Sequence, residues 1–365
     1  MTDEEYMKLA LRLARRGLGW TSPNPMVGAV LVKDNRIIGR GYHRRFGGNH
    51  AEVNALQNAD ADLTGTTLYV TLEPCCHYGK TPPCVDAIIK NKIKKVVIGT
   101  LDPNPQVSGK SVTILNQRGI ETGVGVLEEE CRELNEAYFK YMTTGLPLVT
   151  IKFAQTLDGR IATASGDSKW ISSEEFRKLA HRLRAINDAI LVGIDTVLAD
   201  NPQLTVRLVK GRNPARVILD SRLRIPLDAE IVRTRDVAPV IIAATTQADR
   251  EKKSKLRELG IEILEVQSDI SGGIDLQGLL KALGERNISS LLVEGGAKVI
   301  TSFLCQKLAD KLVVAIAPKI LGKGTDAVGE LDIARISQSM PLKFQKITRA
   351  GEDIVIEARV ERSAG

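Results

Sequence analysis

Hydrophobic and polar residues alternate at helical spacing near the start of the chain and at strand spacing soon afterwards. The N-terminal segment has one apolar helical face, and Thr2 with Glu5 forms a capping box that predicts the helix start. Two apolar runs, 26–32 and 36–42, flank Asp34-Asn35 and predict a β-hairpin across that turn. The chain therefore opens with a helix followed by two antiparallel strands.

The rest of the first half continues to alternate between strands and helices. The predicted elements are strands over 66–72 and 95–101, and helices from about residue 50, over 84–91 and over 127–142. This alternation indicates an α/β fold with an α/β/α layered sheet. The segment 143–147 includes Gly145 and Pro147 and is typical of a linker, so we expect two domains, 1–145 and 146–365.

Strand-like apolar runs dominate the second half as well. Ser172 with Glu175 forms a capping box that predicts the start of a basic helix. The predicted strands are 148–153, 189–192, 216–219, 240–243, 261–266, 290–293, 311–317 and 353–361, with helices up to Asp200 and over 275–285. These elements predict a second α/β domain built on a mixed sheet.

Composition and charge narrow the class of protein. A chain of 365 residues exceeds one typical core, which again favours two domains. The net charge of +7 and the pI of about 9.1 favour anionic partners, either nucleic acid or phosphorylated small molecules. Aromatic residues make up only 4%, which leaves few platforms for stacking the bases of a single strand.

The N-terminal residues and the cysteines predict a cytoplasmic protein. The first residues are acidic, unlike a signal peptide, and no apolar run is long enough to span a membrane. The five cysteines lack the spacing of a disulfide framework. We therefore expect reduced cysteines and a cytoplasmic location.

Four residues carry the most specific chemistry: His50, Glu52, Cys75 and Cys84. One histidine and two cysteines suit tetrahedral Zn²⁺ and leave the fourth position for water, as in catalytic sites. Zinc lowers the pKa of such a water toward neutrality. In zinc nucleobase deaminases, a glutamate two residues after the histidine moves protons without binding the metal. The pattern predicts a zinc-dependent deaminase in which Glu52 transfers protons.

The spacing between the two cysteines departs from the usual deaminase pattern. Eight residues, 76–83, separate them instead of two, and two prolines stiffen this insert. His77 and Lys80 add hydrogen-bond donors and positive charge beside the metal, which suits an anionic substrate. Two alternatives stay open: a closed structural zinc site with Cys76 or His77 as fourth ligand, and buried cysteines that bind nothing.

A Gly-Gly pair follows the predicted strand 290–293. Gly295-Gly296 would let backbone N–H groups approach a phosphate at the start of a helix. Such a pair more often serves close packing alone, and no Gly-x-Gly-x-x-Gly fingerprint follows a strand here. The pair by itself therefore does not identify a nucleotide site.

Six motifs, in order along nearly the whole chain, resemble the bifunctional deaminase–reductase family of riboflavin biosynthesis. They are HAE at His50, TLEPCCHYGKTPPC from Thr71, DPNP at Asp102, KFAQTLDGR from Lys152, DNPQLTVR from Asp200 and VEGG from Val293. The insert that ends in Thr-Pro-Pro-Cys is the most specific of them. Thr156 stands where the family pattern has serine, but the hydroxyl is kept.

The resemblance implies a fold and a reaction for each half. The N-terminal domain would be cytidine-deaminase-like and the C-terminal domain similar to dihydrofolate reductase. With zinc, the first would deaminate 2,5-diamino-6-(5-phosphoribosylamino)pyrimidin-4-one by hydrolysis. With NADPH, the second would reduce the ribosyl group of 5-amino-6-(5-phosphoribosylamino)uracil to ribityl.

The resemblance also implies roles for residues of the first domain. Zinc would be held by His50, Cys75 and Cys84, and Glu52 would be catalytic. Substrate contacts would come from Asn24, His43, His77, Lys80, Asp102 and Asn104. The plain alternative for His43 is a surface histidine at the end of the hairpin. For Asn24 and Asn104, both next to prolines, it is turn chemistry.

In the second domain, the resemblance implies a substrate group and a cofactor group. Substrate contacts would come from Lys152, Ser168, Arg184, Leu204, Arg207 and Glu294, with the phosphate on Ser168 and the two arginines. NADPH contacts would come from Ala154, Trp170, Thr196, Asp200, Ser221 and Gly296. The plain alternative for Arg184 is a solvated helix face, and for Asp200 it is an N-cap before Asn201-Pro202.

Two rival functions remain on the sequence alone. One is a nucleic-acid editing deaminase with an appended binding domain, which the basic pI allows but the stiff insert and scarce aromatics disfavour. The other is a nonenzymatic zinc module in which Glu52 merely caps a helix. We expect a phosphorylated pyrimidine as substrate, no nucleic-acid or membrane partner, and a homo-oligomer, either a dimer or a tetramer.

Overall fold

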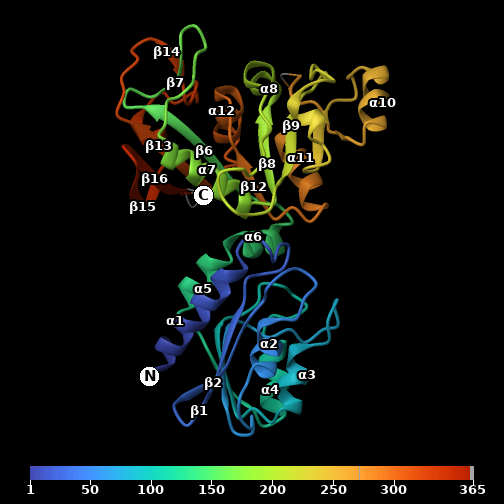
Figure 1. Cartoon of the computed structure of the whole chain (residues 1–365), viewed down its shortest axis with the longest axis vertical. Coiled ribbons are helices and arrows are strands. Elements are labelled where there is room, and N and C mark those ends of the chain that lie inside the picture. The colour runs from blue at the N-terminus through green and yellow to red at the C-terminus, as the bar shows by residue number, and fades with distance from the viewer. Residues whose placement is uncertain (271, 362–365) are drawn as a thin grey trace. The chain divides into compact units, whose positions relative to one another are not determined.

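The computed structural model describes residues 1–270 and 272–361, and Figure 1 shows its elements. By internal contacts the chain divides into two compact units, Met1–Gly145 and Leu146–Gly365. None of the described helices is long and apolar enough to cross a membrane.

The first unit is built on a five-stranded sheet with the order β2-β1-β3-β4-β5. The strands are β1 (Gly28–Lys33), β2 (Arg36–Tyr42), β3 (Thr67–Leu72), β4 (Lys95–Thr100) and β5 (Glu121–Val124). Strand β1 is antiparallel to both β2 and β3, whereas β3, β4 and β5 run parallel. The predicted hairpin is confirmed: both turn residues, Asp34 and Asn35, have positive φ, as its tight turn requires.

Helices cover both faces of this sheet, which confirms the layered α/β/α prediction. The helices are α1 (Asp3–Ala14), α2 (Ala51–Gln57), α3 (Cys84–Lys90), α4 (Lys110–Gln117), α5 (Glu128–Leu134) and α6 (Glu136–Thr144), with a 3-10 turn over Arg15–Gly17. One buried cluster joins α1 and α5 to the sheet, and a second joins α2, α3 and α4 to it. The capping box of α1 is confirmed, since Glu5 N–H donates to Thr2 Oγ1 at 3.3 Å.

The single helix predicted over 127–142 is wrong, because the structure has two helices that break at Asn135. The Asn135 side chain accepts from Met26 N–H at 2.8 Å and donates to the Met26 carbonyl at 2.9 Å. These two hydrogen bonds tie the buried Asn135, at the break between α5 and α6, to the distant backbone at Met26. This long-range contact is invisible in the local pattern.

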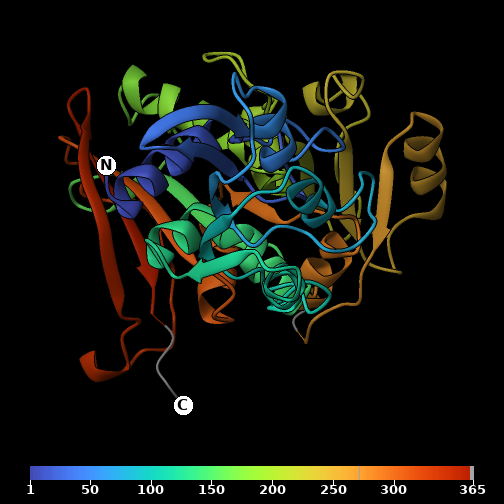
Figure 2. The ribbon, with the colours of Figure 1, turned by 90° about the horizontal axis from the view of Figure 1, so that it is seen from below.

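The second unit is built on a nine-stranded sheet with the order β11-β10-β9-β8-β12-β6-β13-β16-β15. The strands are β6 (Leu148–Thr156), β8 (Ala189–Gly193), β9 (Ala215–Leu219), β10 (Val240–Ala244), β11 (Glu262–Glu265), β12 (Ser290–Val293), β13 (Lys311–Ala317), β15 (Leu342–Ala350) and β16 (Asp353–Val360). The sheet is parallel from β11 to β13, and the β15–β16 hairpin adds antiparallel strands. In Figure 2 this hairpin, in red, lies at the opposite edge of the sheet from the gold strand β11.

Among the described residues, six α-helices accompany this sheet. They are α7 (Glu174–Ile186), α8 (Ile194–Asp200), α9 (Glu230–Arg233), α10 (Arg250–Glu258), α11 (Leu276–Gly284) and α12 (Ala297–Cys305). The capping box predicted at Ser172 is wrong by one residue, because Ser173 caps α7 by accepting from Phe176 N–H at 3.2 Å. The Ser173 hydroxyl also bonds to Asp353, which fixes the helix start from the distant strand β16.

Several elements of the second unit were not predicted. A small sheet pairs β7 (Arg160–Thr163) with β14 (Gly324–Asp326), and β15 was missed although it is nine residues long. Most side chains of β15 are exposed, so its sequence lacks the alternation of a strand with one buried face.

Candidate active sites

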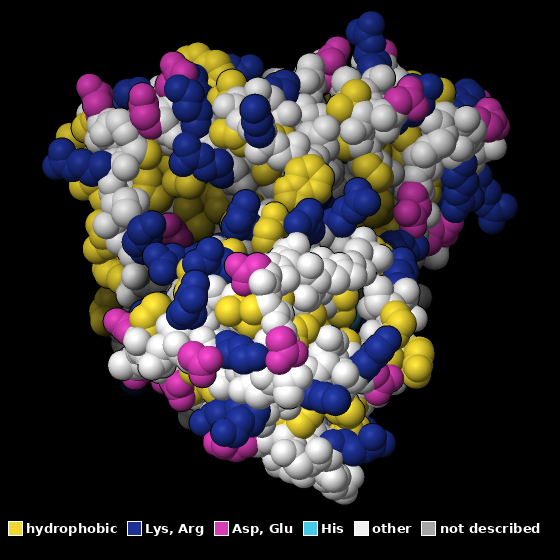
Figure 3. Space-filling view, turned by 60° about the horizontal axis from the view of Figure 1, so that its bottom comes forward, with side chains coloured by type: hydrophobic (Ala, Val, Ile, Leu, Met, Phe, Trp, Pro, Cys, Tyr) yellow, Lys and Arg dark blue, Asp and Glu magenta, His cyan; other side chains and the backbone are white. Residues whose placement is uncertain are grey.

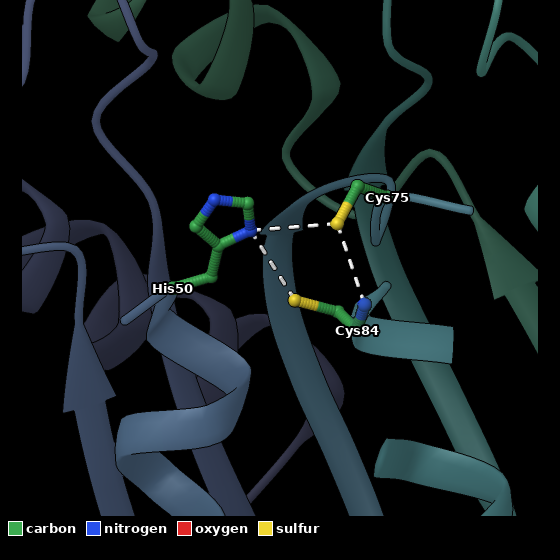
Figure 4. Close-up of side chains that lie close together, drawn as sticks. All are labelled: His50, Cys75 and Cys84. Carbon is green, nitrogen blue, oxygen red and sulfur yellow. Dashed lines mark hydrogen bonds between the residues drawn. The ribbon is translucent and has the colours of Figure 1, made fainter. Parts of the chain in front are cut away.

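The three predicted zinc ligands converge in the first unit, as Figure 4 shows. His50 is the N-cap of α2, Cys75 follows β3, and Cys84 opens α3. His50 Nδ1 lies 3.4 Å from Cys75 Sγ and 3.3 Å from Cys84 Sγ. Tetrahedral Zn–N and Zn–S bonds of about 2.0–2.3 Å put neighbouring ligand atoms roughly 3.5 Å apart. The donor set and its spacing therefore fit zinc.

The cluster has three protein ligands among the described residues, which matches an open site and not a closed one. The Cys76 thiol lies instead 3.7 Å from the Gln106 carbonyl oxygen. Hydrogen bonds from Cys84 and His50 outweigh burial and lower the pKa of Cys75 to about 4. A thiolate, the form that binds metals, is thus favoured at this position.

Glu52 lies in the first turn of α2 and is 3% exposed. Burial raises the pKa of its carboxyl above the ordinary value, while the nearby His50 opposes this. A carboxyl with a raised pKa can take up and release a proton closer to neutral pH than an exposed one. Its position beside the ligand cluster suits proton transfer.

Asn24 and His43 lie next to the metal ligands. The Asn24 side-chain amide is 3.4 Å from His43 Nε2, and His43 Nδ1 is 3.0 Å from the Asn49 carbonyl oxygen. The rings of His43 and His50 meet edge to face at 5.3 Å between centroids. His43 is not the surface histidine of the alternative reading, since it is buried, and burial lowers the pKa of its ring.

Asp102 is held by a network that the sequence did not reveal. Its carboxylate accepts from the Tyr138 hydroxyl at 3.0 Å and from Asn104 N–H at 2.8 Å. Burial raises the pKa of Asp102 to about 6. The buried Glu73 accepts three backbone N–H groups, including that of Asp102, and so fixes the loop. Glu73 stands beside the Pro-Cys motif and could have been suspected, whereas nothing local marks Tyr138.

The insert between the cysteines contributes two further predicted residues. The buried Nδ1 atom of His77 has no hydrogen-bond partner among the described residues. A buried polar atom without a partner is expensive, so it is available to a ligand. His77 also lies near enough to Asp102 to lower the pKa of that carboxyl. Lys80 is exposed, and its ammonium stands 3.9 Å above the Phe46 ring.

In the second unit the structure brings together Lys152, Arg184 and Glu294. Arg184 Nε and Nη2 donate to the two Glu294 oxygens at 2.7 and 2.9 Å, and Lys152 Nζ lies 3.5 Å from Oε2. Burial opposes ionisation of Glu294, but the two cations outweigh it and lower its pKa to about 2. Arg184 is therefore part of a buried cluster and not a solvated helix face.

Arg207 and Leu204 lie on the loop between α8 and β9, beside that cluster. Arg207 Nη1 donates to the Thr205 hydroxyl at 2.7 Å. Burial lowers the pKa of Arg207, and the nearby Arg184 charge lowers it further. Leu204 is buried and has a positive φ of 56°. Ser168 lies half-buried on the loop between β7 and α7.

The residues expected at the nicotinamide cofactor occupy several elements. A Cβ atom on Gly296 would lie 3.3 Å from Thr196 Oγ1, so the turn before α12 and helix α8 are in close contact. Ser221 lines a cavity of about 210 Å³ with Lys298 and Val299. Asp200 ends α8 and does not cap a following helix, so the N-cap alternative is wrong.

The two remaining residues expected at the cofactor are Ala154 and Trp170. Ala154 lies in β6 opposite Ala315 of β13. Trp170 is 66% exposed, and the Arg177 guanidinium stacks 4.1 Å from its ring centre.

Each of the two units matches a known protein family. Residues 147–356 match the family described as the RibD C-terminal domain, and residues 1–100 match the cytidine and deoxycytidylate deaminase zinc-binding region. The riboflavin biosynthesis protein RibD of Aquifex aeolicus (strain VF5) is 50% identical, over 97% of each chain. That of Escherichia coli (strain K12) is 40% identical, over 98% of this chain and 99% of its own.

Solved structures agree over the full length. RibD from Acinetobacter baumannii (form 1) superposes with a TM-score of 0.90 and 40% identity, covering 99% of each chain. A Thermotoga maritima protein described as a diaminohydroxyphosphoribosylaminopyrimidine deaminase/5-amino-6-(5-phosphoribosylamino)uracil reductase gives a TM-score of 0.85 and 43% identity, with 98% and 99% covered. These matches span both units, so the chain belongs to the RibD family of bifunctional deaminase/reductase enzymes of riboflavin biosynthesis.

Proposed function

We propose that residues 1–145 carry the deaminase activity, with zinc held by His50, Cys75 and Cys84. The observation that supports this most directly is the convergence of three donor atoms beside the buried Glu52. When bound, zinc supplies a Lewis acid that makes water nucleophilic near neutral pH. Glu52 takes the proton of that water and returns it to the leaving amino group as ammonia departs.

The substrate of this unit is 2,5-diamino-6-(5-phosphoribosylamino)pyrimidin-4-one. Asn24, His43, His77, Asp102 and Asn104 meet its base edge and ribose, and Lys80 meets its phosphate. The paired donors and acceptors around His43 and Asp102 support this, as does the unpartnered Nδ1 of His77. On the face that Figure 3 shows, Lys and Arg side chains lie among Asp and Glu side chains.

Residues 146–365 carry the reductase activity on 5-amino-6-(5-phosphoribosylamino)uracil. Lys152 and Glu294 meet its ribose or pyrimidine, and Leu204 packs against it. Ser168, Arg184 and Arg207 bind its phosphate, because the planar guanidinium matches phosphate oxygens. The proximity of Arg207 to Arg184 supports this role, since two neighbouring cations favour an anion between them.

The nicotinamide cofactor is NADPH. Gly296 lies at its pyrophosphate, Ala154, Trp170, Thr196 and Asp200 line its path, and Asp200 assists proton transfer. Ser221 and Lys298 line the same cavity, and a serine beside a lysine suits the 2′-phosphate that distinguishes NADPH from NADH. Because the cofactor supplies the hydride, these residues mainly orient it against the substrate carbon.

The chain also forms a homo-oligomer, and its β15–β16 hairpin makes the contact with a second copy of the chain. Cross-strand pairs Phe344–Ala358 and Ile347–Ile356 place apolar residues on one face. Phe344 is 60% and Ile347 59% exposed on strand β15, which ends the sheet. An unpaired edge strand with a row of exposed apolar residues is a template for pairing.

A cytoplasmic location agrees with the five free cysteines.

The test of the deaminase assignment is the Glu52→Gln variant, which keeps the shape of the side chain and removes its proton transfer. We expect bound zinc to stay at one per chain and ammonia release to fall by about 10²–10⁴-fold. Reduction of the deaminated substrate by NADPH is expected to continue as in the unchanged protein. Ammonia release at the normal rate in the variant would refute the assignment of Glu52.

A further inference from the structure

The loop that carries Arg207 is held by side chains from other parts of the fold. From Gln203 to Arg207, this segment lies outside helices and strands. Two of its carbonyl oxygens accept from arginines: Gln203 O from Arg216 Nη1 at 3.1 Å, and Thr205 O from Arg184 Nη1 at 3.2 Å. Two of its backbone N–H groups donate to side chains: Val206 N–H to Asn213 Oδ1 at 2.7 Å, and Arg207 N–H to His181 Nδ1 at 2.9 Å. Side chains of α7, of β9 and of the residues just before β9 thus hold the backbone of this segment.

His181 is one member of this set that has no assigned role. It lies on α7 and is 6% exposed. Its Nδ1 atom faces two backbone N–H groups, that of Arg207 at 2.9 Å and that of Leu208 at 3.4 Å. A ring nitrogen that accepts N–H groups must be unprotonated, so His181 is neutral with its hydrogen on Nε2.

The charges around His181 favour the neutral ring. Burial lowers the pKa of His181 to about 4, and Arg184, Arg207 and Lys152 lower it as well, whereas Glu294 opposes them. At neutral pH the ring is therefore an acceptor at Nδ1. Protonation would place a donor against the two N–H groups and would break both contacts.

We propose that neutral His181 is a positioning residue of the reductase, which holds the Arg207 backbone so that the guanidinium stays beside Arg184 at the substrate phosphate. This inference rests on the proposed role of the two arginines. Like charges at close range repel each other, so Arg207 needs restraints to stay beside Arg184, and these come from the bond of its guanidinium to Thr205 and the bond of its backbone to His181. The acceptor at Nδ1 supplies this fixation from a rigid helix.

The test compares two variants that differ in one acceptor atom. In His181→Asn, the amide oxygen is bonded to Cγ, as Nδ1 is in histidine, so an acceptor remains near the same place. In His181→Leu, the side chain has a similar bulk but no acceptor. The assay is reduction of the deaminated pyrimidine, in its phosphorylated and dephosphorylated forms, by NADPH. For His181→Leu we expect KM for the phosphorylated substrate to rise about tenfold, with kcat within twofold and no change for the dephosphorylated substrate. For His181→Asn we expect all values within threefold of the unchanged protein.

A further pair of variants separates this inference from the role proposed for Arg207. Arg207→Gln tests the phosphate site, and Arg182→Gln on the exposed face of α7 is its control for the same loss of charge. If Arg207→Gln raises KM for the phosphorylated substrate but His181→Leu does not, the positioning role is wrong and the phosphate site stands. If Arg207→Gln changes nothing, the phosphate site itself is wrong.

The pH profile gives a second readout that does not depend on a stable leucine variant. As pH falls toward 4, protonation of His181 should raise KM for the phosphorylated substrate in the unchanged protein. His181→Asn cannot be protonated there, so its KM should depend on pH only through the substrate and the other groups. Identical acid limbs in the two proteins would overturn the proposal.

Discussion

The Glu294→Gln substitution gives the sharpest test of the buried charge cluster in the second unit. The side chain of Glu294 is 7% exposed and meets Arg184 at 2.7 Å and Lys152 at 3.5 Å. Glutamine keeps the shape but leaves two cations without their anion. Breaking a buried ion pair by removing one partner costs about 3–5 kcal/mol. We therefore expect the second unit to lose about that much stability at neutral pH.

The pKa of Glu294 gives a second estimate of the same quantity. Its ordinary pKa is 4.5 and its folded pKa is about 2, and at 1.36 kcal/mol per pH unit the difference corresponds to about 3 kcal/mol. Because the pKa is lowered by folding, this stability is present above pH 4.5 and is lost as pH falls toward 2. The unchanged protein and the variant should therefore converge in stability over that window.

Fluorescence can follow the second unit alone, because the chain has two tryptophans, Trp20 in the first unit and Trp170 in the second. In a Trp20→Phe background, urea unfolding should show the destabilisation in Glu294→Gln. A control, Glu352→Gln, removes an exposed carboxylate of the same unit and should change stability by less than about 0.5 kcal/mol. Equal midpoints for Glu294→Gln and Glu352→Gln at pH 7 would refute the account of this cluster.

Three further predictions address the first unit and the assembly. Asn135→Ala removes both bonds to Met26 and should destabilise the first unit by about 2–3 kcal/mol, measured by the fluorescence of Trp20 in a Trp170→Phe background. A chelator that strips zinc should abolish ammonia release while NADPH oxidation on the deaminated substrate continues, and loss of both activities would contradict separate sites. Phe344→Lys should convert the oligomer to monomers in light scattering, whereas Gln277→Lys, at an exposed position of α11, should leave it intact, and equal masses for both would exclude the hairpin contact.

The sequence predicted the parts of the fold that local patterns determine. The capping box at Thr2 and the turn at Asp34-Asn35 depend on neighbouring residues, and the structure confirms both. The helix break at Asn135 and the cap at Ser173 depend on Met26 and Asp353, which are far away in sequence. Local periodicity cannot contain such contacts.

The residues of the two sites also divide into those that the sequence predicts and those that depend on distant contacts. His50, Cys75 and Cys84 could be predicted because zinc chemistry demands those residue types at motif spacing. Glu73 and His181 act by accepting backbone N–H groups of distant loops, and a single carboxylate or imidazole in a sequence does not reveal its partner. The pairing of Arg184 with Glu294 joins residues 110 positions apart, so charge pattern alone would have left Arg184 on a solvated face.

The most direct test of the central claim is a two-stage assay on the purified, unmodified chain. The diaminopyrimidine ribosyl phosphate is added first and ammonia is measured, and NADPH is then added and its oxidation is followed. The account predicts stoichiometric ammonia before any NADPH is present, and NADPH oxidation only after deamination. Zinc-loaded protein that releases no ammonia, or NADPH oxidation in the second stage when no ammonia was released in the first, would contradict it.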